Sequence, residues 1–145
     1  MNVKKATIHD LEAVSELFDL YRQFYEQPSD LAAAREFLQA RMMNNESVIF
    51  MAYDGEEAAG FVQLYPSFSS VSMKRSWVLN DLYVKKQARG KGVGEKLIAK
   101  AAEMAGETGA KGLFLETASD NLPAQRLYEK IGFTKETNYF YYLSV

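Results

Sequence analysis

The sequence contains no cysteine and a single histidine, His9. The absence of cysteine excludes disulfides, thiolate metal sites and a covalent acyl-cysteine intermediate. His9 lies beside Asp10 before an expected helix, and no G-x-S-x-G motif is present. We therefore interpret His9 as a surface residue and not as the base of a hydrolase triad. We also expect no metal cofactor.

Long apolar runs and an excess of either charge are missing as well. No apolar stretch approaches the roughly 18 residues of a membrane span, and the N-terminus has no signal-peptide core. The 19 acidic and 17 basic side chains give a net charge of −2, which attracts neither nucleic acid nor an anionic membrane. With 145 residues, 48% of them hydrophobic, we expect one cytoplasmic domain over residues 1–145.

The first part of the chain predicts a strand followed by two helices. The strand is expected at residues 3–6, and Thr7-x-x-Asp10 resembles a capping box that opens the first helix. The second helix should start after Pro28-Ser29-Asp30 and run to about Met43. Each helix has one apolar face. These faces consist of Leu11, Val14, Leu17, Phe18, Tyr21 and Tyr25 in the first helix and of Leu31, Ala34, Phe37, Leu38 and Met42 in the second.

A β-hairpin is expected next. VIFMAY at 48–53 and AAGFVQLYP at 58–66 flank an Asp54-Gly55 turn. Pro66 should end the second strand, because proline has no backbone N–H to donate to a neighbouring strand. We interpret residues 67–76 as a polar loop whose basic side chains, Lys74 and Arg75, are solvated.

The centre of the chain changes its apolar period. WVLNDLYV at 77–84 is rich in β-branched and aromatic residues, as in a strand, whereas Val93, Leu97 and Ala101 recur at helical spacing. KGLFLET at 111–117 then predicts a buried strand. A strand, a turn, a helix and a strand form a βαβ unit, whose two strands are parallel.

Three glycines join the central strand to its helix: Gly90, Gly92 and Gly94. Without Cβ atoms, their backbone can adopt unusual dihedral angles and approach a ligand closely. The first turn of the following helix has N–H groups without intrahelical partners and a partial positive charge. This pattern indicates an anion site, most naturally for phosphate. The alternative is a tight, flexible turn without a ligand. The spacing matches neither G-x-x-x-x-G-K-[ST] nor G-x-G-x-x-G.

The segment Gln87-Ala88-Arg89-Gly90-Lys91-Gly92 resembles the Q/R-x-x-G-x-G/A signature of the GNAT superfamily of N-acetyltransferases. A second GNAT signature, N-x-x-A-x-x-x-Y-x-x-x-G-F, is matched by Asn121, Ala124, Tyr128, Gly132 and Phe133. The resemblance covers residues 77–135. It implies an α/β fold, in which a central mixed β-sheet with a βαβ cofactor-binding core is flanked by helices.

The resemblance also implies how acetyl-CoA is bound. The glycine loop would hold the pyrophosphate, and the pantetheine amides would add to strand 77–84 like another strand. A backbone N–H of the same strand would stabilise the oxyanion. The cofactor-binding residues expected on this basis are Leu82, Tyr83, Val84, Gln87, Arg89, Gly90, Lys91, Gly92, Val93, Gly94, Asn121, Ala124 and Tyr128.

An amine acceptor needs a group that takes its proton. With a pKa near 10.4, on the order of one part in a thousand of such an amine is neutral at pH 7. Asp81 is the best-placed carboxylate, whereas Asn80 occupies a position that is acidic in GNAT diamine acetyltransferases. Asparagine cannot hold a proton, so we expect the base to be Asp81 or a water chain ending at Asp81 or Glu116. Alternatively, Asp81 is a structural carboxylate that accepts backbone hydrogen bonds.

By analogy with the family, Tyr128 donates a proton to the departing thiolate. A tyrosine near pKa 10 is a weaker acid than a thiol near pKa 8.5, so a hydrogen bond to the developing charge on sulfur is the safer role. Alternatively, Tyr128 is only a core aromatic residue of its helix. Two readings also remain for Tyr21, Phe24 and Tyr25, which either line the acceptor pocket or pack in the core.

The final residues, NYFYYLSV at 138–145, predict an aromatic strand that pairs antiparallel at the end of the sheet or forms a homodimer contact. The favoured function is an acetyl-CoA-dependent N-acetyltransferase, in which a small cationic amine such as a polyamine attacks the thioester directly. The alternatives are acetylation of protein lysines or N-termini, a CoA-binding regulatory module without chemistry, and an unrelated nucleotide-binding domain.

Overall fold

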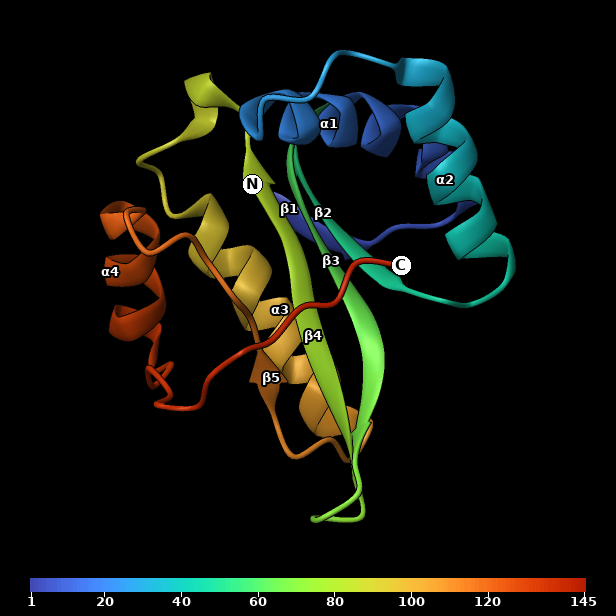
Figure 1. Ribbon diagram of the computed structural model, residues 1–145. Coiled ribbons are helices and arrows are strands. Elements are labelled where there is room, and N and C mark those ends of the chain that lie inside the picture. Colours follow the sequence, from blue (N-terminus) through green and yellow to red (C-terminus); the bar gives the residue numbers. More distant parts are fainter.

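Five strands form one sheet, in the order β1-β2-β3-β4-β5, in the computed structural model, which describes residues 1–145 (Figure 1). The strands are β1 (Asn2–Lys5), β2 (Val48–Asp54), β3 (Glu57–Ser69), β4 (Lys74–Val84) and β5 (Leu113–Phe114). β1 to β4 pair antiparallel, and β5 pairs parallel with β4. The predicted mixed sheet, the first hairpin and the parallel pair are therefore confirmed.

Four helices flank the sheet, and the caps expected at Thr7, Asp30 and Asn121 are present. They are α1 (Leu11–Phe24), α2 (Leu31–Met43), α3 (Val93–Glu107) and α4 (Leu122–Ile131), with short 3-10 turns η1 (Ile8–Asp10) and η2 (Lys86–Ala88). The Thr7 hydroxyl accepts from the His9 N–H at 3.3 Å, and the Asp10 carboxylate accepts from the Thr7 N–H at 2.9 Å. His9 is exposed, as expected. None of the helices is both long and apolar enough to cross a bilayer.

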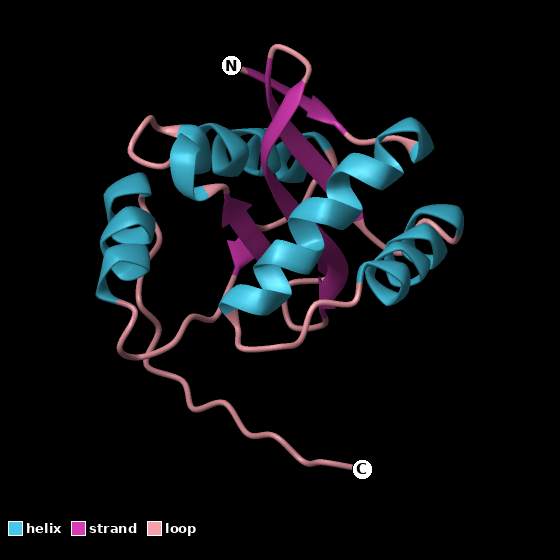
Figure 2. Cartoon of the chain, turned by 90° about the horizontal axis from the view of Figure 1, so that it is seen from above, coloured by secondary structure: helices cyan, strands magenta, loops and turns pink.

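The sheet has a separate apolar core on each face. α3 covers one face, where Leu97 and Ile98 pack against Phe50 and other residues of the sheet. α1 and α2 cover the opposite face, where Leu17 and Leu38 are fully buried. Figure 2 shows the sheet between these layers. The alternation of side chains along β2 supplies both cores, since neighbouring residues of a strand point to opposite faces.

A buried carboxylate fixes the connection between α1 and α2. Asp19 accepts hydrogen bonds from the Ser29 hydroxyl at 2.6 Å and from the Asp30 N–H at 2.8 Å. The Ser29 bond is the largest influence on the pKa of Asp19, which lies below its ordinary value. Asp30 in turn caps α2 by accepting from the Ala33 N–H at 3.1 Å. This chain of bonds sets the position at which α2 starts over the sheet.

The prediction that Pro66 ends its strand is wrong. β3 continues through Pro66 to Ser69, and β4 begins at Lys74, so residues 67–76 belong to a second hairpin and not to a loop. Pro66 lies opposite Trp77, whose N–H points away from β3 and donates to Gly112 O at 3.1 Å. In such a pair neither residue donates across the ladder, so the missing N–H of Pro66 costs no hydrogen bond.

The prediction that Arg75 is only solvated is also wrong, because its side chain packs on two aromatic rings. Its guanidinium carbon lies 4.9 Å from the centroid of the Phe68 ring and 5.3 Å from that of the Trp77 ring. This arrangement covers one side of the second hairpin with the arginine side chain. Lys74, in contrast, is exposed, as expected.

Two further strand predictions differ from the structure, since one strand is shorter and more exposed than expected and the other is absent. The strand expected over 111–117 contains only Leu113 and Phe114, and Phe114 is 50% exposed instead of buried. Residues 138–145 form no strand at all, and Tyr139 and Tyr141 are each 89% exposed. The apolar patterns indicate strand-forming segments, but a strand also requires a neighbouring strand to pair with, and neither segment has one along its length.

Candidate functional site

The outer edge of β4 is free beyond Val78. β5 pairs with β4 only at Trp77 and Val78, whereas β4 continues to Val84 beside β3 alone. The residues expected to bind pantetheine, Leu82, Tyr83 and Val84, lie in this unpaired part and are half-buried. Main-chain groups there have no strand partner on the outer side and can accept an extended ligand as an added strand.

A β-bulge lies at the start of this free edge. Asp81 is opposite Gln63 and Leu79 is opposite Leu64, so Asn80 has no partner on β3. A bulge of this kind bends the strand and redirects its side chains. Asn80 is exposed, while the neighbouring Asp81 is only 2% exposed.

The Asp81 carboxylate is the centre of a polar network. Its two oxygens accept hydrogen bonds from Gln63 Nε2 at 2.5 Å and from Asn80 Nδ2 at 2.6 Å. The Tyr21 hydroxyl is adjacent and donates to the carbonyl oxygen of Asn80 at 3.3 Å. Burial raises the pKa of Asp81, and the hydrogen bonds from Asn80 and Gln63, together with the nearby Tyr21 hydroxyl, oppose this increase. A buried carboxyl with a raised pKa is suited to accept a proton near neutral pH.

Aromatic side chains surround this network. Tyr21 packs edge-on against Tyr25 of α1, with ring centroids 5.1 Å apart. Burial, together with the charge of Asp81, raises the pKa of Tyr21 well above its ordinary value. Burial also raises the pKa of Tyr65 to about 12; the Asp81 charge adds to this increase and Arg41 opposes it. The pKa of Tyr65 thus responds to both an acidic and a basic side chain.

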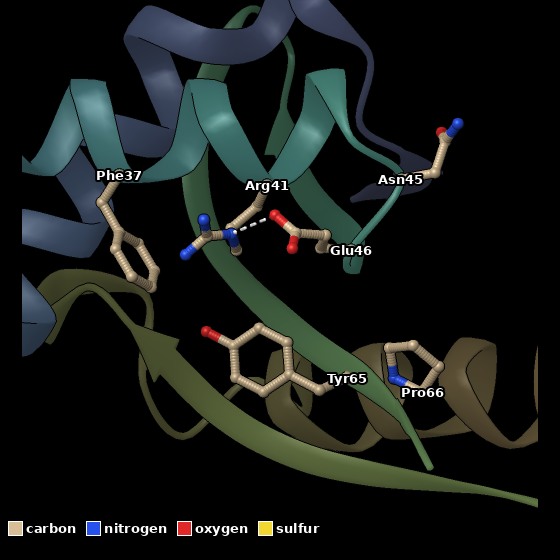
Figure 3. Close-up of a pocket in the computed structure, with 6 residues that line it drawn as sticks. All are labelled: Phe37, Arg41, Asn45, Glu46, Tyr65 and Pro66. Atoms are coloured by element: carbon tan, nitrogen blue, oxygen red, sulfur yellow. Dashed lines mark hydrogen bonds and ion pairs between the residues drawn. The ribbon is translucent and has the colours of Figure 1, made fainter.

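A shallow, open cavity of about 580 Å³ lies on the Arg41 side of Tyr65. Figure 3 shows the Tyr65 hydroxyl pointing toward the side chains of Phe37 and Arg41. Arg41 is held by an ion pair from Nε to Glu46 at 3.0 Å and by the Phe37 ring, 4.5 Å from its guanidinium carbon. Its two terminal nitrogens form no hydrogen bond with the protein. The cavity is lined by Phe37, Arg41, Asn45, Glu46, Tyr65 and Pro66.

The glycine loop follows directly after the free edge of β4. Gly90 and Gly92 have φ angles of 79° and 78°, a conformation that favours glycine, and an added Cβ at either position would meet no atom within 4 Å. α3 begins after Gly92 without a side-chain cap, so its first N–H groups are left for a ligand. Backbone donors of this kind fit an anion such as pyrophosphate.

The other residues expected to bind the cofactor around the glycine loop differ in how far they are exposed. Arg89 is tied to the end of β4, because its Nε donates to Val84 O at 2.9 Å and its guanidinium lies 5.6 Å from the Tyr83 ring centroid. Gln87 and Lys91 are exposed. Val93 is 2% exposed and packs in the core, so it can offer a ligand only its main chain.

The second signature lies on α4. Asn121 caps this helix by accepting from the Ala124 N–H at 3.3 Å. Tyr128 is half-buried with its ring 5.7 Å from that of Phe133. Burial, and to a lesser degree Tyr25, raises the pKa of Tyr128. The hydroxyl therefore stays protonated at neutral pH and can donate a hydrogen bond.

α4 also contacts the first turn of α3. Lys130 forms an ion pair with Glu95 at 2.7 Å, and a Cβ at Gly94 would lie 3.5 Å from the Leu127 side chain. The glycine loop and Tyr128 are thus held on adjoining helices. Glu116, the alternative end of a water chain, is exposed and forms no hydrogen bond or ion pair with the protein.

Sequence reasoning missed three residues that the structure brings to this region. Gln63 could have been noticed as a polar residue within an apolar strand, since a buried amide needs partners. Arg41 lies on α2, and Tyr65 lies on β3. No local pattern singles out Arg41 or Tyr65, because the cavity forms only when α2 packs over the hairpin.

Comparisons with known proteins agree with this arrangement. Residues 14–133 match the model of the Acetyltransferase (GNAT) family. An uncharacterized N-acetyltransferase, YhfO, of Bacillus subtilis is 49% identical over 142 residues, which cover 98% of this chain and 95% of that protein. A probable acetyltransferase of Haemophilus influenzae is 34% identical, with 89% and 97% covered.

A solved structure supports the same assignment. The crystal structure of a probable acetyltransferase superposes with a TM-score of 0.93 at 43% identity, and the match covers 100% of this chain and 99% of that chain. The family model matches most of the sequence and the solved structure superposes on the whole chain, so both comparisons indicate the same family. The chain belongs to the GNAT family and is an acetyl-CoA-dependent N-acetyltransferase.

Proposed function

We propose that this enzyme acetylates the primary amine of a small acceptor that also carries a carboxylate, as an amino acid does. The observation that carries this proposal is the Arg41 guanidinium, which is held by Glu46 and Phe37 and toward which the Tyr65 hydroxyl points (Figure 3). An acceptor spanning this region would bring its amine toward Asp81 and its carboxylate toward Arg41.

Arg41 has the properties of a carboxylate-binding residue. Its Nε is already paired with Glu46 and its face with Phe37, so the guanidinium is held in place with two terminal nitrogens available. Arginine binds carboxylates with two parallel hydrogen bonds.

A polyamine, which the sequence favoured, is the second candidate. Asp81 and the aromatic rings of Tyr21 and Tyr25 suit a cation, but the terminal cationic groups of a polyamine would meet Arg41. One relative supports an amino-acid acceptor: the D-amino-acid N-acetyltransferase HPA3 of Saccharomyces cerevisiae is 36% identical over 85 residues, 57% of this chain and 53% of that protein. Protein lysines and N-termini remain the third class.

Acetyl-CoA would supply an activated acetyl thioester, and the protein's groups act around it. Backbone N–H groups of the glycine loop and of the first turn of α3 would bind its pyrophosphate. The free edge of β4 would orient the pantetheine, and a main-chain N–H there would stabilise negative charge on the thioester oxygen. Asp81 accepts the acceptor's proton, directly or through water beside Asn80, so that the amine attacks without an acyl-enzyme. Tyr128 donates a hydrogen bond to the departing sulfur.

The variant Asp81→Asn distinguishes the two roles considered for Asp81, a catalytic base and a structural carboxylate. A raised pKa means that the folded state loses stability as the pH rises through that pKa, and a neutral amide removes this loss. We therefore expect the melting temperature at pH 7 to stay the same or rise while kcat falls by about a hundredfold or more. The acidic limb of the kcat/KM profile against pH should disappear as well. A lower melting temperature with nearly normal kcat would assign Asp81 a structural role.

Tyr128→Phe removes one hydroxyl and leaves the ring against Phe133. A hydrogen bond to a charged group contributes about 1.5 to 3 kcal/mol, so we expect kcat to fall by about ten- to a hundredfold. The dissociation constant of acetyl-CoA, measured by calorimetry, should change little because the bond forms only as the sulfur gains charge. Unchanged turnover would exclude Tyr128 from the reaction.

Gly92→Ala tests the pyrophosphate site, and Gly55→Ala is its control. Both glycines have positive φ, 78° and 62°, and neither has an atom within 4 Å of an added Cβ, so the backbone strain should be similar. Only Gly92 lies where the main chain should approach a ligand. We expect the KM for acetyl-CoA to rise about tenfold in Gly92→Ala alone. Equal KM values in the two variants would contradict a pyrophosphate site at this loop.

Arg41→Gln tests the acceptor with lysine and cadaverine, which differ by one carboxylate. The wild-type enzyme should favour lysine, and the variant should lose about ten- to a hundredfold in kcat/KM for lysine but little for cadaverine. Glu46→Gln keeps the guanidinium and should retain the preference. Spermidine and a lysine-containing peptide complete the panel in a thiol-release assay. A wild-type enzyme that favours either of these over every amino acid would contradict the proposal.

A further inference from the structure

Gln63 is a fully buried polar side chain in the apolar middle of β3. Its Nε2 donates to Asp81 Oδ2 at 2.5 Å, whereas its Oε1 is buried and has no hydrogen-bond donor within reach in the protein. A buried carbonyl oxygen without a donor lowers the stability of a folded protein. An apolar residue would therefore serve the core better at this position, which indicates a use for Gln63 other than packing.

The pairing of the two strands fixes Gln63 beside Asp81. These residues are directly opposite each other in the ladder between β3 and β4, next to the bulge at Asn80. Side chains of directly opposite residues are close enough to interact. Asn80 Nδ2 donates to Asp81 Oδ1 at 2.6 Å. The exposed amide of Asn80 thus holds one oxygen of the carboxyl, and the buried amide of Gln63 holds the other.

The two ends of the Gln63 amide suit the two protonation states of Asp81. An ionised carboxylate only accepts hydrogen bonds, whereas a protonated carboxyl also donates one through its O–H. The NH₂ group of Gln63 serves the ionised form, as the structure shows. The unpartnered Oε1 is the acceptor that the protonated form needs. Because the last torsion of a glutamine side chain is broad and roughly two-fold, a half-turn exchanges the two groups within the same buried space.

We propose that Gln63 is a positioning residue for Asp81, whose amide turns with each proton transfer, donating to the carboxylate and accepting from the carboxyl O–H. This inference rests on the proposed function, in which Asp81 takes the proton of the acceptor. The proton leaves the ammonium nitrogen of the acceptor and is held on Asp81 Oδ2, whose O–H then donates to Gln63 Oε1. Loss of that proton to solvent returns the amide to its first orientation.

The titratable groups that face Asp81 from neighbouring elements are two tyrosine hydroxyls, Tyr21 of α1 and Tyr65 of β3. Burial, followed by the charge of Asp81, raises the pKa of both, that of Tyr65 to about 12. Both hydroxyls therefore stay neutral while Asp81 titrates. No charged side chain contributes to the pKa of Asp81. A change in its titration after substitution of Gln63 thus reports on the pair itself.

Neutron diffraction from deuterated crystals of the wild-type enzyme tests the turn without any substitution. The carbon NMR signal of the Asp81 carboxyl gives its titration midpoint, and crystals are studied above and below that pH. Above it, we expect the amide deuterons of Gln63 to point at Oδ2. Below it, we expect one deuteron between Oδ2 and the Gln63 oxygen. Amide deuterons that face Asp81 at both pH values would overturn the proposal.

Gln63→Met keeps the length of the side chain and removes both amide groups, and Ser15→Ala is its matched control. Ser15 is also fully buried with an unpartnered oxygen. A hydrogen bond to a carboxylate is stronger than one to a neutral carboxyl, so the pKa of Asp81 should rise by about one unit in Gln63→Met alone. The acidic limb of kcat/KM should move to higher pH by the same amount, while the KM for the amine changes little.

The carboxyl signal distinguishes a failure of this proposal from a failure of the proposed function. An unchanged pKa of Asp81 in Gln63→Met would overturn the role of Gln63. A pKa that rises while the kcat/KM profile stays in place would support the pairing of Gln63 with Asp81 and contradict Asp81 as the base.

Discussion

The site depends on the different surroundings of the two ends of β4. At Trp77 and Val78 the strand is paired on both sides, whereas from Leu79 to Val84 it is paired with β3 alone. The bulge at Asn80 lies next to this change, and the glycine loop begins where the strand stops. One strand therefore provides the unpaired main-chain groups, the buried Asp81 carboxylate and the entry to the anion site.

Burial differs between the two ends of the proposed acceptor region. Asp81 is enclosed, which raises its pKa and favours proton uptake. Arg41 is less enclosed, and it is kept in position by Glu46 and Phe37. The Tyr65 hydroxyl points toward Arg41. A site with this separation of charge can distinguish acceptors by the anionic group they carry, while the chemistry at the amine stays the same.

The features that could be predicted from the sequence are those fixed by neighbouring residues. The caps at Thr7, Asp30 and Asn121 and the positive φ angles at Gly90 and Gly92 follow from local chemistry. Features that depend on distant partners could not be predicted. The cavity at Arg41 forms only when α2 packs over β3. The continuation of β3 through Pro66 depends on the N–H of the opposite residue, Trp77, pointing away from β3. The strand pattern at 138–145 likewise does not specify whether a neighbouring strand is present for the segment to pair with.

The partial burial of α4 has a consequence for hydrogen exchange at its backbone. No residue of this helix is fully buried, although Leu127 and Tyr128 pack against the core that includes α3, and an exposed ion pair, Lys130 to Glu95, links the two helices. Elements with little buried area open at low free energy, well before the rest of a protein unfolds. The amides of α4 therefore exchange with solvent sooner than those of β3 and β4, and faster at high salt, because exposed ion pairs are screened.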